Sequence, residues 1–340
     1  MADSAKSNIR GMLYEQERRS LSEYAFLTAD TKGREAPLKP CSIRTEFQRD
    51  RDRIIHSKAF RRLMHKTQVF LSPEEDHYRT RLTHTFEVTQ IARTIARALR
   101  LNEDLCEAIG LGHDLGHTPF GHAGERVLTR CYDKNFTHYK QSLRVADKLE
   151  NLNLTYEVRD GIYHHTHGGA STLEGRIIKY ADKIAYINHD IDDARRAKIL
   201  TAADIPSSVR AKIGETHGER IDRMVISVVN ASMNGNEIKM EPDVEETTDE
   251  LYEFLYKNVY TNPIAKGEEA KAEALLERLY LYFTENPETM PGEYKSIAEA
   301  EGIERAVCDY ISGMTDRYAI NTYKNLFIPE GWNSVRSIYI

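Results

Sequence analysis

The stretch HDLGHTPFGH, residues 113–122, decides how this sequence folds. It sets an imidazole, His113, beside a carboxylate, Asp114, directly after the apolar run 105–111. That run indicates a buried helix, which we expect to loosen at Gly116. Neighbouring side chains on a helix point about 100° apart, yet both can contact one cation at a loosened helix end. One imidazole and one carboxylate suit Mn, Fe, Ni, Zn or, less well, Mg.

Histidines gather around this stretch. Nine of the 13 histidines lie between His84 and His189. A single histidine is usually an ordinary surface or core residue, but nine beside aspartates are better explained by a metal or catalytic site. We interpret four others as ordinary histidines: His56, His65, His77 and His217.

Two further metal ligands must come from other helices, and His84 is the first candidate. It lies on a predicted helix, 79–99, on one stripe with Val88, Ile91 and Ile95. A buried imidazole needs a partner, which a metal ion supplies. Taken alone, His84 is better explained as a core histidine bonded to a carbonyl group than as a metal ligand.

Asp182 is the second candidate, within the largely apolar helical stretch 177–186. A buried carboxylate is costly unless it is paired or bound to a metal. Taken alone, it also fits a surface ion pair with Lys183 or Lys179.

Helical periodicity dominates the chain and predicts a mainly α fold. Asn102 is placed to cap a helix that starts at Glu103. The best strand candidate is 152–158, and we expect irregular backbone at 27–42, 201–219 and 234–247. Further helices are predicted at 43–65, 120–132, 138–150, 171–190, 220–233, 245–258, 266–284 and 296–313.

The length of 340 residues is enough for one large or two modest domains. A soft boundary near 200–220 separates a histidine-rich part, 1–200, from a helical C-terminal part, 201–340. We do not require two independent domains. The 40% hydrophobic and 29% charged residues are typical of a folded globular protein.

The formal net charge of −6 does not favour loose binding to nucleic acid or to an acidic membrane. Residues 44–100 nevertheless hold 13 Lys/Arg against 7 Asp/Glu, whereas 241–254 hold seven acids and no base. The basic segment fits either a bound anion or, more simply, a solvated helix face. Scattered cysteines and the absence of a signal sequence or long apolar run predict a soluble cytoplasmic protein.

Several longer motifs resemble one known family. The arrangement of His84, His113-Asp114 and Asp182 resembles the H…HD…D signature of the HD phosphohydrolase superfamily. Within it, the chain resembles the dNTP triphosphohydrolase, or dGTPase-like, family. The resemblance implies an HD-domain helical bundle with a C-terminal helical extension and few short strands. It rests on FRRL at 60–63, KTQVF at 66–70, RTRLTHT at 79–85, residues 112–122 and GMTDRY at 313–318.

The resemblance implies one divalent metal ion, Mn, Mg, Fe, Ni or Zn, held by His84, His113, Asp114 and Asp182. Such a metal polarises the α-phosphate and activates water. The implied reaction converts a deoxynucleoside triphosphate to a deoxynucleoside and tripolyphosphate.

Four catalytic residues follow from the same resemblance. His122 is implied as the proton donor to the leaving 5′ oxygen, and Glu125 as the group that orients it. The i, i+3 spacing of these two on one helix permits a hydrogen bond. His117 and His138 are implied as phosphate-facing histidines. The histidine-rich segment 163–168 is expected to line the substrate.

Five further residues are implied as substrate contacts. Arg81 and Lys183 correspond to phosphate contacts, and Gln68 and Asp190 to contacts with the 3′-hydroxyl. Tyr186 corresponds to a residue packed on the sugar, where crowding excludes a 2′-hydroxyl.

The resemblance also implies a homo-oligomer and leaves room for an allosteric nucleotide and for nucleic acid, which the net charge does not favour. No membrane contact is expected. The alternatives are another HD phosphohydrolase, such as a 5′-deoxynucleotidase or a cyclic-nucleotide phosphodiesterase, or a non-catalytic binder of nucleotides or single strands. The preferred base, the native metal and the oligomer number do not follow from the sequence.

Overall fold

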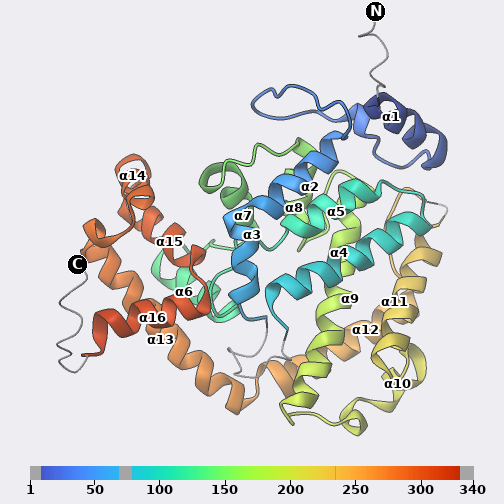
Figure 1. Cartoon of the computed structure of the whole chain (residues 1–340). Helices are drawn as coiled ribbons and strands as arrows, with labels where there is room; N and C mark the ends of the chain where they lie inside the picture. Colours follow the sequence, from blue (N-terminus) through green and yellow to red (C-terminus); the bar gives the residue numbers. More distant parts are fainter. Residues whose placement is uncertain (1–8, 69–78, 234, 330–340) are drawn as a thin grey trace, which may run out of the picture.

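A computed structural model describes residues 9–68, 79–233 and 235–329, so His77 and the Val69-Phe70 pair of the KTQVF motif lie outside the described residues. The described chain is mainly α-helical, which confirms the predicted fold class (Figure 1). Its α-helices are α1 Ile9–Ser20, α2 Glu46–His56, α3 Lys58–Arg62, α4 Arg81–Ala98, α5 Glu103–Gly112, α6 His122–Cys131, α7 His138–Arg144, α8 Tyr156–His164, α9 Leu173–Arg196, α10 Ser207–Ile213, α11 His217–Ser232, α12 Pro242–Leu255, α13 Pro263–Glu285, α14 Gly292–Glu301, α15 Ile303–Gly313 and α16 Asp316–Phe327.

Side-chain caps fix the starts of α4, which carries His84, and α5, which precedes His113. The Asn102 side chain accepts a hydrogen bond from the Leu105 N–H at 3.3 Å, so the predicted cap of α5 is confirmed. At α4, Thr80 and Thr83 exchange backbone and side-chain hydrogen bonds in a reciprocal cap. These caps satisfy N–H groups that a helix start leaves without partners.

The predicted strand at 152–158 is wrong. Helix α8 starts at Tyr156, and Thr155 forms only an isolated antiparallel bridge with Arg34. The buried Asp50 carboxylate accepts the Thr155 N–H at 2.8 Å and its hydroxyl at 2.7 Å. A side chain from α2 thus occupies the donor that a longer β-ladder would use.

Three other boundaries also differ from expectation. The segment 43–65 is not one helix, because Ser57 ends α2 and caps α3. The segment 296–313 breaks at Gly302, where φ is +96°, a conformation that favours glycine. The stretch 201–219 is not wholly irregular, since it contains α10.

Two hydrophobic clusters organise the molecule. The first cluster joins α2, α4, α5, α8 and α9 and continues through α10, α11 and α12. The second cluster joins α6 to α13, α14, α15 and α16. Figure 1 shows α14–α16 and α6 on one side of the molecule and α4, α5 and α9 on the other. The clusters therefore do not follow chain order, and the division at 200–220 stays a prediction.

Buried polar groups tie the second cluster to the loop that precedes α4. The Asp316 carboxylate, at the start of α16, accepts the N–H groups of Thr67 and Phe120, each at 2.8 Å. Lys66 donates to the carbonyl of Ser312 at 2.8 Å and to that of His117. Through Asp316, the motif at 313–318 therefore holds the turn of the histidine stretch that contains Phe120.

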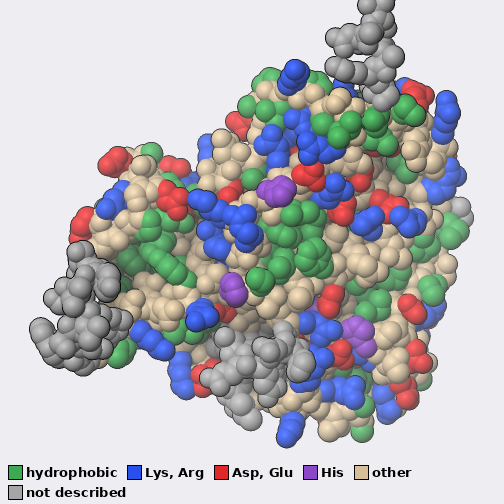
Figure 2. All heavy atoms as spheres, viewed as in Figure 1, with side chains coloured by type: hydrophobic (Ala, Val, Ile, Leu, Met, Phe, Trp, Pro, Cys, Tyr) green, Lys and Arg blue, Asp and Glu red, His purple; other side chains and the backbone are tan. Residues whose placement is uncertain are grey.

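The surface carries both signs of charge. Figure 2 shows Lys and Arg side chains interspersed with Asp and Glu on the face that it displays. Many bases of 44–100 are paired, including Arg51 with Glu107 at 3.1 Å and Arg97 with Glu103 at 2.7 Å. The excess of base in that segment is therefore largely a paired helix face. Among the described helices, none is long and apolar enough to span a membrane.

Candidate active site

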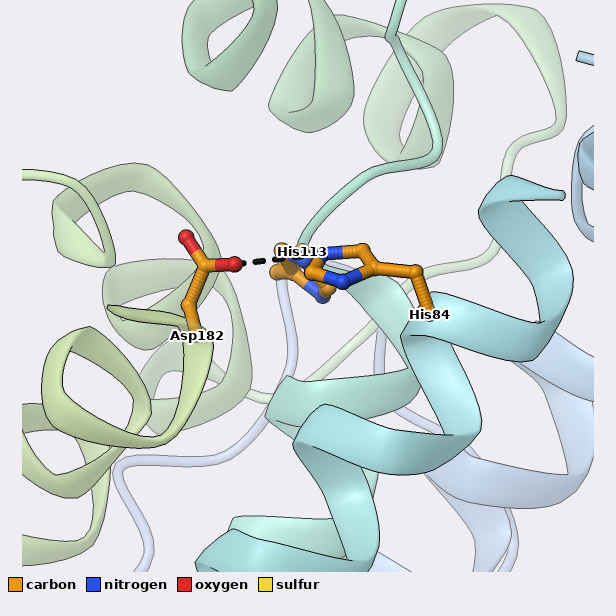
Figure 3. Close-up of side chains that lie close together, drawn as sticks. All are labelled: His84, His113 and Asp182. Carbon is orange, nitrogen blue, oxygen red and sulfur yellow. Dashed lines mark ion pairs between the residues drawn. The ribbon is translucent and has the colours of Figure 1, made fainter. Parts of the chain in front are cut away.

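Three helices bring His84, His113 and Asp182 together. His84 is on α4, His113 follows α5, and Asp182 is on α9; Figure 3 shows their side chains pointing toward one another. One ligand atom from each lies within 4.8 Å of the other two, and His84 Nε2 is 3.1 Å from Asp182 Oδ1. The α4 stripe is buried as predicted, with Val88 and Ile95 fully covered. Such packing, at about 1.5–3 kcal/mol per apolar side chain, keeps His84 facing the cluster.

The backbone aims His113 into the cluster. Its Nδ1 lies 2.7 Å from the carbonyl oxygen of Gly110, one turn earlier. Its Nε2 is buried and has no hydrogen-bond partner within the described chain. A buried nitrogen without a partner costs free energy, which a bound cation would remove.

Asp114 adjoins the same cluster and also pairs with a cation of the chain. Its Oδ2 lies 3.9 Å from His84 Nε2 and accepts from Arg81 Nη1 at 2.6 Å. Burial raises the pKa of the Asp114 carboxyl, but His113 and Arg81 together hold it well below its ordinary value. Arg81, expected as a phosphate contact, is thus placed beside the candidate metal ligands by its ion pair with Asp114, which the sequence did not reveal.

Close packing at Gly116 joins the histidine stretch to α7. A Cβ at Gly116 would lie 2.1 Å from the Ser142 nitrogen, so only glycine fits there. The Gly116 N–H donates to the Ser142 hydroxyl at 2.9 Å. Helix α7 is thereby pressed against the turn, and its first residue, His138, is brought beside His117.

The four predicted catalytic residues lie in one group. The rings of His117 and His138 stack with centroids 4.7 Å apart, and the His122 ring is 5.6 Å from that of His117. Glu125 is shared: one oxygen is 3.4 Å from His122 Nδ1, and the carboxylate also lies 3.3 Å from His138 Nδ1. The predicted His122–Glu125 contact is present, but Glu125 orients two imidazoles rather than one.

The pKa values of the two stacked histidines, His117 and His138, are shifted in opposite directions. Burial, followed by the nearby Arg81 charge, lowers the pKa of His117 well below its ordinary value. Burial also acts to lower the pKa of His138, but the hydrogen bond to Glu125 outweighs it and raises that pKa. A neutral imidazole therefore stacks on one that binds a proton more tightly, an arrangement suited to proton transfer.

Three predicted substrate residues lie along α9. Lys183 forms an ion pair with Asp249 of α12, so its charge is already matched. Burial raises the pKa of the Tyr186 hydroxyl, and its ring lies 6.2 Å from that of Tyr252. Asp190 is buried and accepts a hydrogen bond from the Tyr260 hydroxyl.

Gln68 and Asp190 share one further property. Gln68 Oε1 and Asp190 Oδ1 are both buried, and neither accepts a hydrogen bond from the described residues. Buried acceptors are normally satisfied, so each of these two oxygens is available to a donor that the described residues do not supply.

The sequence interpretation missed the roles of two buried histidines. His165, within the segment expected to line the substrate, lies 3.2 Å through Nε2 from His138 Nε2 and packs its ring 5.1 Å from that of His113. His189 packs 5.1 Å from the His84 ring. Both belong to the histidine cluster of the sequence, but neither could be assigned a partner from spacing alone.

Comparison with known proteins gives the class. Residues 81–187 match the HD domain, and residues 238–325 match the phosphohydrolase-associated domain. The class is therefore that of an HD phosphohydrolase.

Relatives named deoxyguanosinetriphosphate triphosphohydrolase-like protein match nearly the whole chain. That of Caldanaerobacter subterraneus is 56% identical over 95% of this chain and 97% of its own length. Those of Desulfatibacillum aliphaticivorans and Clostridium tetani are 49% and 44% identical, covering 94% and 96% of this chain and 98% of each relative. The chain belongs to this dGTPase-like family of HD phosphohydrolases.

Proposed function

We propose that the protein hydrolyses deoxynucleoside triphosphates to a deoxynucleoside and tripolyphosphate, with one divalent metal ion. One observation carries the choice of substrate: the buried acceptors Gln68 Oε1 and Asp190 Oδ1 receive no hydrogen bond from the described residues. The single O–H of a sugar 3′-hydroxyl would supply a donor to Asp190 Oδ1, and a site built for it would reject sugars without it. The names of the relatives, deoxyguanosinetriphosphate triphosphohydrolase-like proteins, agree with this substrate class.

The residues present fit a divalent metal. His84, His113 and Asp182 offer two nitrogens and an oxygen within 4.8 Å of one another, and His113 Nε2 has no hydrogen-bond partner among the described residues. Asp114 would complete the set. A metal bound there would act as a Lewis acid on a phosphate oxygen and lower the pKa of a bound water.

The remaining residues would bind the phosphates and move protons. His122 would protonate the leaving 5′ oxygen when the bond from that oxygen to the α-phosphorus breaks, while Glu125 holds its imidazole in place. Arg81 would contribute positive charge beside the phosphates while keeping Asp114 oriented. His117 and His138 would contact the phosphate chain, and Lys183 would do so on leaving Asp249.

The test is incubation of purified protein with each dNTP and with Mn²⁺, Mg²⁺, Fe²⁺, Ni²⁺ or Zn²⁺, followed by chromatography of the products. We expect a deoxynucleoside and tripolyphosphate in equal amounts, and no turnover after chelation of the metal. Release of orthophosphate would instead favour a nucleotidase. Hydrolysis of a cyclic nucleotide in place of dNTPs would favour a phosphodiesterase.

A further inference from the structure

We propose that His189 and Tyr260 together clamp the Asp190 carboxylate and so determine selectivity for a substrate 3′-hydroxyl. The inference rests on the proposed function and adds two positioning residues to it. Neither was a candidate in the sequence, and each acts on a different oxygen of Asp190.

His189 is held on both sides of its ring. It is fully buried, its Nδ1 lies 2.9 Å from Glu87 Oε2, and its Nε2 lies 3.2 Å from Asp190 Oδ1. Glu87 is itself fixed by Arg79, which donates to it at 2.9 Å and pairs with Asp193 at 3.3 Å. The imidazole therefore has little freedom to turn away from Asp190.

Tyr260 holds the other oxygen from a different part of the chain. Its hydroxyl donates to Asp190 Oδ2 from the π-helical segment Tyr256–Tyr260, which follows α12. π-helical turns within helices often accompany functional sites. The segment also leads into α13, which packs on α6. Tyr260 thus connects Asp190, the proposed sugar contact, through α13 to α6, which carries His122.

The clamp leaves one lone pair available. The contact between His189 Nε2 and Asp190 Oδ1 is close, but it does not form a hydrogen bond, so Oδ1 has no hydrogen-bond donor among the described residues. A carboxylate oxygen accepts from more than one direction. Asp190 is consequently oriented by both neighbours while Oδ1 can still accept from a sugar hydroxyl. Without the clamp, the carboxylate can rotate and the 3′-hydroxyl loses its fixed acceptor.

The experiment compares His189→Gln and Tyr260→Phe with wild type, using dGTP and 2′,3′-dideoxy-GTP as probes. We expect the ratio of kcat/KM for dGTP over that for dideoxy-GTP to fall about tenfold in each variant, mainly through dGTP. Metal content should stay at the wild-type value, because the metal ligands are untouched. His189→Gln placed on Asp190→Asn should lower the ratio no further, since the effect passes through Asp190.

Two matched controls isolate the clamp. His217→Gln removes another imidazole paired with a carboxylate, Asp192, at 2.9 Å, and Tyr256→Phe removes an exposed hydroxyl from the same π-helical segment. Both should keep the wild-type ratio. Circular dichroism identifies any variant that fails to fold, and the conservative Tyr260→Phe then decides the outcome.

An equal loss for dGTP and dideoxy-GTP in both clamp variants would mean a general structural role and would overturn the proposal. Absence of dNTP hydrolysis by the wild type would instead overturn the proposed function. In that case the ratio of the Kd values for the same two nucleotides, measured by calorimetry, tests the clamp by itself. A ratio unchanged by His189→Gln and Tyr260→Phe would then reject it.

Discussion

The two hydrophobic clusters differ in what they hold. The first surrounds His84, whose side chain is 2% exposed, and fixes the candidate metal ligands between packed helices. The second carries α6, whose His122 side chain is 72% exposed and contacts Glu125 and the His117 ring. A metal ligand must not move, whereas a proton donor must exchange protons with solvent. We infer that the molecule divides metal binding and proton transfer between its two clusters.

The largest effect should come from the first cluster. Asp114→Ala removes a proposed ligand and leaves Arg81 buried without its partner. We expect metal content, measured by elemental analysis after gel filtration, to fall to background. Hydrolysis should fall roughly 10³-fold or more, because a bound metal would supply several kcal/mol of transition-state stabilisation. Asp222→Ala, an exposed acid on α11, is the control and should retain both properties. Full metal content and wild-type turnover in Asp114→Ala would refute the metal assignment.

The second cluster should separate chemistry from metal binding. His122→Ala should leave metal content and substrate affinity intact while slowing turnover about 10²–10⁴-fold, the usual range for a general acid or base. Rapid-quench kinetics at saturating dNTP measures this step. An unchanged turnover number would show that His122 is not the proton donor. His117 and His138 would then be tested for that role.

Much of this arrangement could be predicted from the sequence, because the evidence for it is local. The apolar run before His113, the helical stripe through His84 and the cap at Asn102 all follow from periodicity, and the structure confirms them. The carboxylate of Asp182 within an apolar helical stretch made it a candidate, and the structure brings it to His84 and His113. The chemical roles of these residues stay predictions.

Long-range pairs could not be predicted in the same way. The Lys183–Asp249 pair and the Tyr260–Asp190 hydrogen bond join residues that are far apart in the chain and have no shared period. The false strand at 152–158 has the same origin, because its alternating pattern was genuine but Asp50 occupies the N–H of Thr155. Periodicity shows which face of an element is buried, but it does not identify the partner.

A smaller effect is expected on the selection of the sugar, which we assign to Tyr186, a residue packed against the first cluster. Tyr186→Ala opens space beside the sugar, so the preference for dGTP over GTP should fall by about 10- to 100-fold. Specificity constants for the two nucleotides measure this preference, and Tyr180→Ala, on the same helix, serves as the control. Equal use of dGTP and GTP by the wild type would contradict the sugar assignment.

The smallest effect on turnover should come from the contact between the clusters. Asp316→Ala leaves the buried N–H groups of Thr67 and Phe120 without acceptors, at a cost of about 1–3 kcal/mol each. We expect a lower free energy of unfolding in urea and a turnover reduced only about tenfold, because Thr67 and the turn that contains Phe120 shift. Asp243→Ala, in the first turn of α12, is the matched control. Unchanged stability would show that Asp316 does not couple the clusters.

The fate of the attacking oxygen tests the central claim most directly. In H₂¹⁸O, attack of water on the α-phosphorus places the label in tripolyphosphate, because the bond that breaks joins this phosphorus to the 5′ oxygen. Mass spectrometry of the products from a dNTP should therefore find one ¹⁸O per tripolyphosphate and none in the deoxynucleoside. Label in orthophosphate or pyrophosphate would contradict the account, as would label in the deoxynucleoside.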